Sequence, residues 1–423
     1  RWPVLNSPMN ALFAANAGMG KLEARAPLIQ PPADYSADRM LETIHALTDP
    51  VLQGRGFGTQ GLDRAAEYIA RAFAQAGLRP GGDTEDSYFQ SWQETGGASQ
   101  ERATLKNVIG VIPGSDPDLS GSVVIGAHYD HLGLGWPDVR EDNRGTIHPG
   151  ADDNASGVAV LLELARVLAG KLQLERDIVF VAFSGEEAGR LGSKHYLQNP
   201  GGEPTFAMLN MDTVGRLEEG KLLVLGADSA REWPHIFRGI GFVTGIESAM
   251  VKEALDSSDQ ISFHQAGIPA VQLFTGANMD YHRPTDRADK IDAQGMIKVA
   301  KVAKEVIEYL GGRQEPLNVR LETAVETEAF AGGQGPRRAS LGSIPDFAYQ
   351  GRGYRLDGVV QGSPAQAAGL RQGDIIVRLN QTDIQGLKDV SAVLKQLEPG
   401  QTVDIRYLRA GSEKSVQASL TEK

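Results

Sequence analysis

The chain has 423 residues, of which 41% are hydrophobic and 23% charged, proportions typical of a globular protein with more than one domain. Its 54 acidic against 42 basic residues give a net charge of -12, so we expect no nucleic-acid partner. Cysteine is absent, which excludes disulfides and thiolate-bound zinc, and no apolar run reaches the roughly 20 residues of a membrane span.

Residues 1–34 end in the Pro-rich stretch APLIQPPADY and are expected to form an N-terminal arm. The chain opens with Arg1 rather than Met, so we expect that an N-terminal piece such as a signal peptide has been removed. We therefore predict an extracytoplasmic location, either periplasmic or secreted, which fits the lack of cysteine.

Residues 35–312 alternate between helical and strand-like patterns. Apolar residues at helical spacing cover 37–50 and 61–78, ending at Pro50 and Gly77. Further along, the expected buried strands are VVIGAHY, DIVFVAFS, AMLNMD, KLLVLG and PAVQLF, and the expected helices are SGVAVLLELARVLAG and MIKVAKVAKEVIEYL. Continuous apolar strands separated by helices predict an α/β domain with a mostly parallel mixed sheet flanked by helices.

Ionisable side chains follow several of these apolar runs. They occur in VVIGAHYDH, HPGADDNASG, VFVAFSGEE, MLNMD and DYHRPTD, and they are His128, Asp152, Glu186 with Glu187, Asp212 and His282. Ligands bind beyond the carboxyl ends of parallel strands, and zinc accepts imidazole nitrogen and carboxylate oxygen. Two adjacent buried glutamates would repel each other unless cations lay between them or one held a proton. The set predicts two zinc ions and one general base.

The order HxD, GADDNASG, SGEE, NMD and YHxPxD resembles the co-catalytic di-zinc aminopeptidase family, which includes bacterial leucyl aminopeptidases, glutamate carboxypeptidase II and the transferrin receptor ectodomain. The resemblance covers roughly residues 35–312. It implies that Asp152 bridges the two zinc ions, that His128 and Asp212 complete one site, and that Glu187 and His282 complete the other.

The same resemblance implies that Glu186 is the general base that activates a metal-bridging water. It implies that Asp130 orients the imidazole of His128 from behind. It also places a cis peptide bond between the two aspartates that match Asp152 and Asp153.

Other polar residues near these motifs are not expected to bind metal or to act as the general base. Asp256 and Asp259 fall in a segment that usually contains SDHxxF, with Gln260 where histidine is common, and Asp259 is expected to be structural. The remaining histidines near the motifs match no ligand position and are expected to be pocket or surface residues: His131, His148 and His264.

Residues 313–338 are rich in Gly, Glu and polar residues and are expected to be a linker, with LNVRLETAV as a candidate strand. Residues 339–423 have a β-rich pattern of their own around the helical LKDVSAVLKQL. LGSIPDF followed by DGVVQGSPAQAAGLRQGDIIVRLNQ resembles the PDZ domains attached to bacterial proteases.

This second resemblance implies that the domain binds a peptide as an added strand and holds its C-terminal carboxylate in a backbone loop. The loop expected to do so is Leu341, Gly342, Ser343 and Ile344, and residues 387–397 would form the groove helix. The alternative is that the groove stays empty and the domain only packs on the catalytic unit.

Together the motifs predict a zinc-dependent aminopeptidase that carries two Zn²⁺ ions per chain and removes N-terminal residues from peptides or proteins. Three alternatives remain open. A carboxypeptidase would need a basic pocket, for which Arg283 and Arg287 are candidates. A glutaminyl cyclase would use one zinc ion, and a non-catalytic peptide-binding homologue would have lost ligands.

Overall fold

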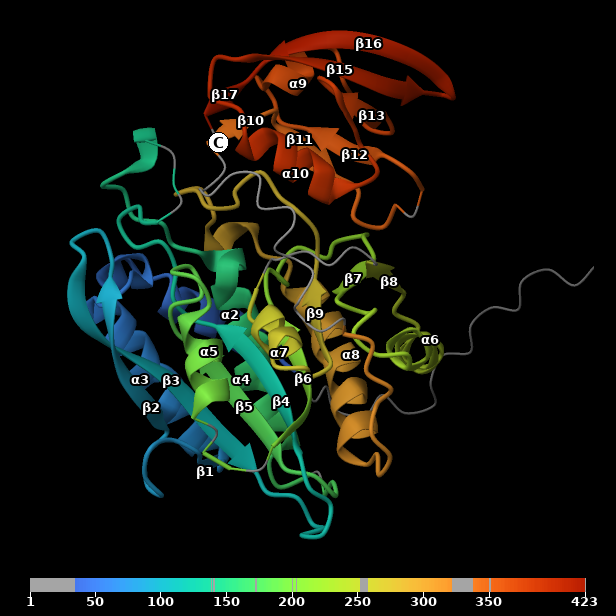
Figure 1. Cartoon of the computed structure of the whole chain (residues 1–423). Coiled ribbons are helices and arrows are strands. Elements are labelled where there is room, and N and C mark those ends of the chain that lie inside the picture. Colours follow the sequence, from blue (N-terminus) through green and yellow to red (C-terminus); the bar gives the residue numbers. More distant parts are fainter. Residues whose placement is uncertain are drawn as a thin grey trace, which may run out of the picture. The chain divides into compact units, whose positions relative to one another are not determined.

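The computed structural model describes residues 35–422, apart from 138, 140, 172, 200, 203, 252–257, 322–337 and 350. The predicted N-terminal arm, Asp256 and most of the predicted linker therefore lie outside the described residues. An α/β domain is followed by a smaller β-rich domain (Figure 1). The exact domain boundaries stay predictions.

The larger domain is built on a nine-stranded sheet in the order β1-β3-β5-β4-β6-β9-β7-β8, with β2 beside β3. The strands are β1 (Arg79–Pro80), β2 (Phe89–Gly96), β3 (Glu101–Ile112), β4 (Ser122–His128), β5 (Ile178–Phe183), β6 (Thr205–Met211), β7 (Leu222–Leu225), β8 (Ser248–Val251) and β9 (Ala270–Phe274). Strands β5, β4, β6 and β9 are parallel, whereas β3 and β7 run antiparallel to their neighbours β5 and β9. The predicted mixed α/β sheet with flanking helices is confirmed. Parallel pairings do not predominate, because four of the described strand pairs are parallel and four are antiparallel.

Helices of the larger domain cover the sheet. They are α2 (Ala37–Leu47), α3 (Gln60–Ala76), α4 (Gly157–Leu168), α5 (Leu191–Gln198), α6 (Trp233–Thr244), α7 (Gln260–Gln265) and α8 (Ala293–Gly311). Helices α2, α3 and α8 begin at residues whose side chains cap them. Thr59 caps α3 by accepting from the amide of Leu62, and Gly77 ends it in the left-handed conformation that glycine adopts without a steric penalty.

The sheet is buried on both faces, as its continuous apolar strands predict. Along β5, Ile178 and Phe180 belong to the core beneath α2, α3, α4, α6 and α8, whereas Val179 and Val181 belong to the core beneath α5 and α7. Successive side chains of a strand point to opposite faces, so one apolar run supplies both cores.

The C-terminal domain is antiparallel and has its own apolar core, which includes Leu356, Ile376 and Ile405. Its elements are β10 (Ala339–Ser340), β11 (Ser343–Pro345), β12 (Tyr354–Val359), α9 (Pro364–Ala367), β13 (Ile375–Leu379), β14 (Thr382–Asp383), α10 (Leu387–Lys395), β15 (Thr402–Arg409), β16 (Ser412–Ser419) and β17 (Thr421–Glu422). Strand β11 stands at one end of the sheet order β11-β12-β13-β15-β16.

The candidate strand in the linker is seen only as an isolated bridge between Val319 and Ala230, because its second half is not described. Within the described residues, no helix combines the length and the apolar character that crossing a bilayer requires.

Candidate metal centre

The ionisable residues predicted from the sequence meet at one edge of the sheet. Strand β4 ends in His128, β5 is followed by Glu186 and Glu187, β6 is followed by Asp212, and the loop after β9 carries His282. Because these strands are parallel, their carboxyl ends lie at the same edge and the loops beyond them come together.

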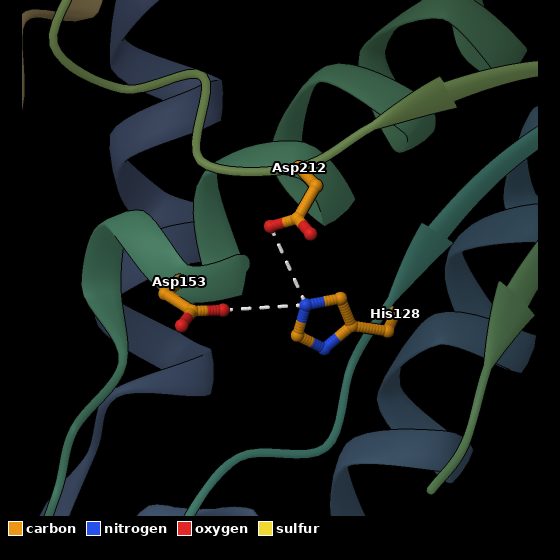
Figure 2. Close-up of side chains that lie close together, drawn as sticks. All are labelled: His128, Asp153 and Asp212. Atoms are coloured by element: carbon orange, nitrogen blue, oxygen red, sulfur yellow. Dashed lines mark ion pairs between the residues drawn. The ribbon is translucent and has the colours of Figure 1, made fainter. Parts of the chain in front are cut away.

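The first cluster joins His128 with two aspartates (Figure 2). The Nε2 atom of His128 lies 3.2 Å from Oδ1 of Asp153 and 3.4 Å from Oδ1 of Asp212, so one ring nitrogen faces both carboxylates. All three side chains are buried. Buried carboxylates are costly unless a cation or strong donors offset their charge.

The second cluster shares Asp153 with the first. His282 Nε2 lies 3.4 Å from Oδ2 of Asp153 and 3.2 Å from Oε2 of Glu187. One oxygen of Asp153 therefore faces each histidine.

The separations in both clusters fit zinc. Ligand atoms about 2.0–2.1 Å from a tetrahedral zinc ion are about 3.3 Å apart from one another. The four imidazole–carboxylate separations span 3.2–3.4 Å. The nitrogen and oxygen donors present are those that zinc accepts, so the residues of each cluster fit zinc.

Asp152 was predicted to bridge the two zinc ions, but the structure places Asp153, one residue later, between the two histidines. Oδ1 of Asp152 accepts a hydrogen bond from the amide of Gly215 (2.7 Å), and its Oδ2 accepts one from Asn278 Nδ2 (2.9 Å). Oδ2 also lies 3.4 Å from Nε of Arg216. Both oxygens of Asp152 bond to groups other than the histidines, and the Asp153 carboxylate lies between His128 and His282 instead. The cis bond is likewise one residue later than expected, between Asp153 and Asn154.

The loop that carries Asp153 is held by Asp286 of the YHRPTD motif. The Asp286 carboxylate accepts the main-chain amides of Asp152 (2.9 Å) and Asp153 (3.0 Å) and pairs with Arg216 (3.1 Å). Burial and the charge of Asp286 raise the pKa of Asp152 to about 8. Asp152 and Asp286 thus support the backbone that presents Asp153.

Asp130 supports the cluster differently from the prediction. The nearest partner of His128 Nδ1 is the main-chain carbonyl of Asp130 at 3.2 Å, whereas the Asp130 Oδ1 atom is 3.7 Å away. The Asp130 carboxylate instead accepts the amides of Glu186 (3.0 Å) and Glu187 (3.3 Å). The residue therefore orients the imidazole through its backbone and the two glutamates through its side chain.

The two adjacent glutamates differ in their pKa values. Burial raises the pKa of Glu186 well above its ordinary value. Burial acts in the same direction on Glu187, but the positive charge of His282 and hydrogen bonds from His131 and His282 lower its pKa to about 2. The environment thus shifts the pKa values of the two adjacent glutamates in opposite directions.

His131 is brought into the cluster, although the sequence indicated no ligand-like place for it. Its ring is buried, and its Nδ1 atom lies 2.8 Å from Oε1 of Glu187. The remaining predictions concern residues outside both clusters: His148 is buried, His264 bonds to the carbonyl of Ala270, and Asp259 is fully buried. The spacing in HYDH, which places a second imidazole three residues after His128, was the available signal for His131.

Comparison with known proteins extends these observations. Residues 107–307 match peptidase family M28, and residues 346–420 match the PDZ domain. A probable leucine aminopeptidase from Arthroderma otae is 31% identical over 319 residues, which cover 70% of this chain and 77% of that protein.

Solved structures share the fold of the α/β domain. The Legionella pneumophila LapA aminopeptidase has a TM-score of 0.53 at 21% identity, covering 70% of this chain and 80% of that one. Porphyromonas gingivalis glutaminyl cyclase has a TM-score of 0.54 at 19% identity, covering 66% and 100%. At these identities the likeness concerns the fold alone. The sequence relationship to the fungal protein and the matched motifs together show that this chain belongs to peptidase family M28 and carries a C-terminal PDZ domain.

Proposed function

We propose that this protein is a di-zinc aminopeptidase that hydrolyses N-terminal residues from peptides. The observation that carries the proposal is the pair of clusters that share Asp153, with all four imidazole–carboxylate separations at 3.2–3.4 Å. His128 and Asp212 would complete one zinc site, and Glu187 and His282 the other. A second complete cluster favours two ions over the single zinc of a cyclase.

The residues suit peptide hydrolysis. Bound zinc would lower the pKa of a water molecule and stabilise negative charge on the scissile carbonyl oxygen. The Glu186 carboxylate would accept the proton of the attacking water and deliver it to the leaving amine. Its half-buried position and raised pKa suit a group that must hold a proton transiently, and Asp130 fixes its backbone.

The charges around the clusters favour a free amine over a free carboxylate as the recognised substrate end. Arg216 pairs with Asp280 at 2.8 Å and with Asp286 at 3.1 Å, and exposed Arg287 lies 3.4 Å from Asp289. Arginines already paired with carboxylates make a weak pocket for a substrate carboxylate, whereas a carboxylate-rich centre attracts an ammonium group. Half-buried Arg283, the other candidate, makes no ion pair among the described residues, so a carboxypeptidase would have to rely on this residue. A carboxypeptidase is therefore the less favoured reading. A non-catalytic role is also disfavoured, because every member of the two clusters is present and Glu186 is retained.

The test compares aminoacyl anilides with their N-acetylated counterparts, using the zinc-loaded protein. We expect cleavage of the free-amine substrates only, abolished by a chelator and restored by added zinc. Equal cleavage of the acetylated set, or no cleavage while two zinc ions remain bound, would contradict aminopeptidase activity. The first result would indicate an endopeptidase-like site and the second a different substrate class.

For the PDZ domain we propose binding of a peptide C-terminus along β11. This strand ends the sheet order, and no other described strand pairs with its outer edge, where an added strand would bond. The preceding Gly342 has φ +69°, and a Cβ atom there would lie 2.3 Å from the Cβ of Ser363, so the loop requires glycine. Leu341 is buried in the domain core and would contribute backbone only, whereas Ser343 and Ile344 are partly exposed.

This proposal is tested on the full chain with a fluorescent peptide library carrying free or amidated C-termini. Charge-assisted hydrogen bonds are worth about 1.5–3 kcal/mol each, so amidation should weaken binding by about tenfold or more. Equal binding of both sets, or of neither, would favour a domain that only packs. An extracytoplasmic location stays a prediction from the sequence.

A further inference from the structure

His131 lies beside the second cluster without sharing the geometry of its members. Its Nδ1 atom is 2.8 Å from Oε1 of Glu187 and 4.0 Å from Oδ2 of Asp153. The first distance is that of a charge-assisted hydrogen bond, and the second is too long for two ligands of one zinc ion, which lie about 3.3 Å apart. His282, by contrast, lies at 3.2 Å and 3.4 Å from the same two carboxylates.

The two oxygens of Glu187 therefore have different partners. Oε2 faces His282 and the position where a metal fits, whereas Oε1 faces His131. Glu187 follows a strand end on a turn, and its side chain has rotatable bonds that burial alone does not fix. A donor on Oε1 selects the orientation in which Oε2 points at the metal.

The His131 ring is itself held in place. Its main-chain amide donates to the carbonyl of Arg55 (3.2 Å), and the ring meets His282 edge-to-face with centroids 6.0 Å apart. Gly150 has φ +59°, and a Cβ atom there would lie 2.5 Å from Cγ and Cδ2 of His131. The first glycine of the GADDN segment thus leaves space for this ring. Within the described residues, Nε2 of His131 has no hydrogen-bond partner, so Glu187 is the polar contact that defines the ring's orientation.

We propose that His131 is a positioning residue that donates from Nδ1 to Oε1 of Glu187 and so directs Oε2 towards the second zinc site. This proposal rests on the di-zinc function proposed above. Outer partners of this kind typically contribute 10–100-fold to metal affinity. His131 belongs to this chain's HYDH segment, and its role is separate from that of His128, which faces the other site.

The test uses two replacements of nearly equal shape. In His131→Asn the amide nitrogen occupies the place of Nδ1 and keeps a donor, whereas His131→Leu fills the same space without one. Zinc content is measured by elemental analysis, and the affinity of each site by competition with a chelator of known zinc affinity. The unfolding midpoint of each metal-free protein is recorded in parallel. His264→Ala serves as a control, because His264 bonds to the carbonyl of Ala270 and contacts no member of either cluster.

We expect wild type and His131→Asn to bind two ions with affinities within about threefold of each other. His131→Leu should keep the first ion and bind the second about 10–100-fold more weakly. Unchanged affinity in His131→Leu would overturn the proposal, as would equal weakening in both variants, which would make His131 a direct ligand. Weakening of both ions together with a lower metal-free unfolding midpoint would also overturn it, because the role would then be structural. Fewer than two ions in the wild type would instead refute the di-zinc function.

Discussion

Asp153→Ala should lower the zinc content of the protein from two ions per chain to less than one. Each Asp153 oxygen faces a different histidine, His128 at 3.2 Å and His282 at 3.4 Å, so its removal takes a ligand from both sites. It also leaves buried imidazoles without their shared carboxylate. Hydrolysis should fall to background, and elemental analysis after gel filtration measures the loss of metal.

The matched control is Asp152→Asn at the neighbouring position. Asp152 bonds to Gly215 and Asn278 and faces neither histidine, and burial raises its pKa. An amide of the same size cannot accept both hydrogen bonds, so a loss of about 1–3 kcal/mol in unfolding free energy is expected. Two bound ions should remain. If Asp152→Asn lost both ions and Asp153→Ala kept them, the sequence-based assignment would be restored.

Glu186→Gln is expected to leave both zinc ions in place and to reduce kcat/KM by about 10²–10⁴-fold, the usual contribution of a general acid–base group. The amide is of the same size but cannot accept a proton. Glu186 belongs to neither cluster, although its amide and that of Glu187 share Asp130 as acceptor. Steady-state kinetics on an aminoacyl anilide and elemental analysis of the same sample measure both quantities.

Glu187→Gln provides the contrast one residue later. Its carboxylate faces His282 at 3.2 Å, so the second ion should be lost or weakened along with activity. Normal turnover by Glu186→Gln would refute its role as general base. Loss of metal from that variant would instead make it a ligand.

Much of this site could be predicted from the sequence because parallel strands bring their carboxyl ends together. His128, Glu187, Asp212 and His282 each follow an apolar run, and the structure collects them at one edge. The same apolar runs predicted a sheet buried on both faces. The hairpin of β2 and β3 was not predicted, since the outer strand FQSWQETG is mostly polar and contains no continuous apolar run.

The choice between Asp152 and Asp153 could not be made locally. Both are acidic, both follow the same loop, and only distant residues distinguish them. Gly215 and Asn278 take the oxygens of Asp152, while the carboxylate of Asp286 holds the two amides. Which of the two adjacent aspartates faces the histidines depends on this backbone path, and the motif GADDN does not specify the path.

The contact of His131 depends on geometry of the same kind. Its position three residues after His128 was visible, but the 2.8 Å contact requires the turn after β5 to return beside the loop after β4. Asp130 likewise has two contacts that spacing did not predict: its carbonyl bonds to His128, and its carboxylate accepts the amide of Glu186. Such side-chain assignments follow from loop conformation, which residue spacing alone does not determine.

The central claim is that Asp153 lies between two zinc ions, and the most direct measurement is anomalous diffraction at the zinc absorption edge from crystals of the zinc-loaded protein. We predict two anomalous peaks about 3.5–4 Å apart, one beside His128 and Asp212 and the other beside Glu187 and His282, with Asp153 contacting both. A single peak, or a pair of peaks bridged by Asp152, would contradict the account.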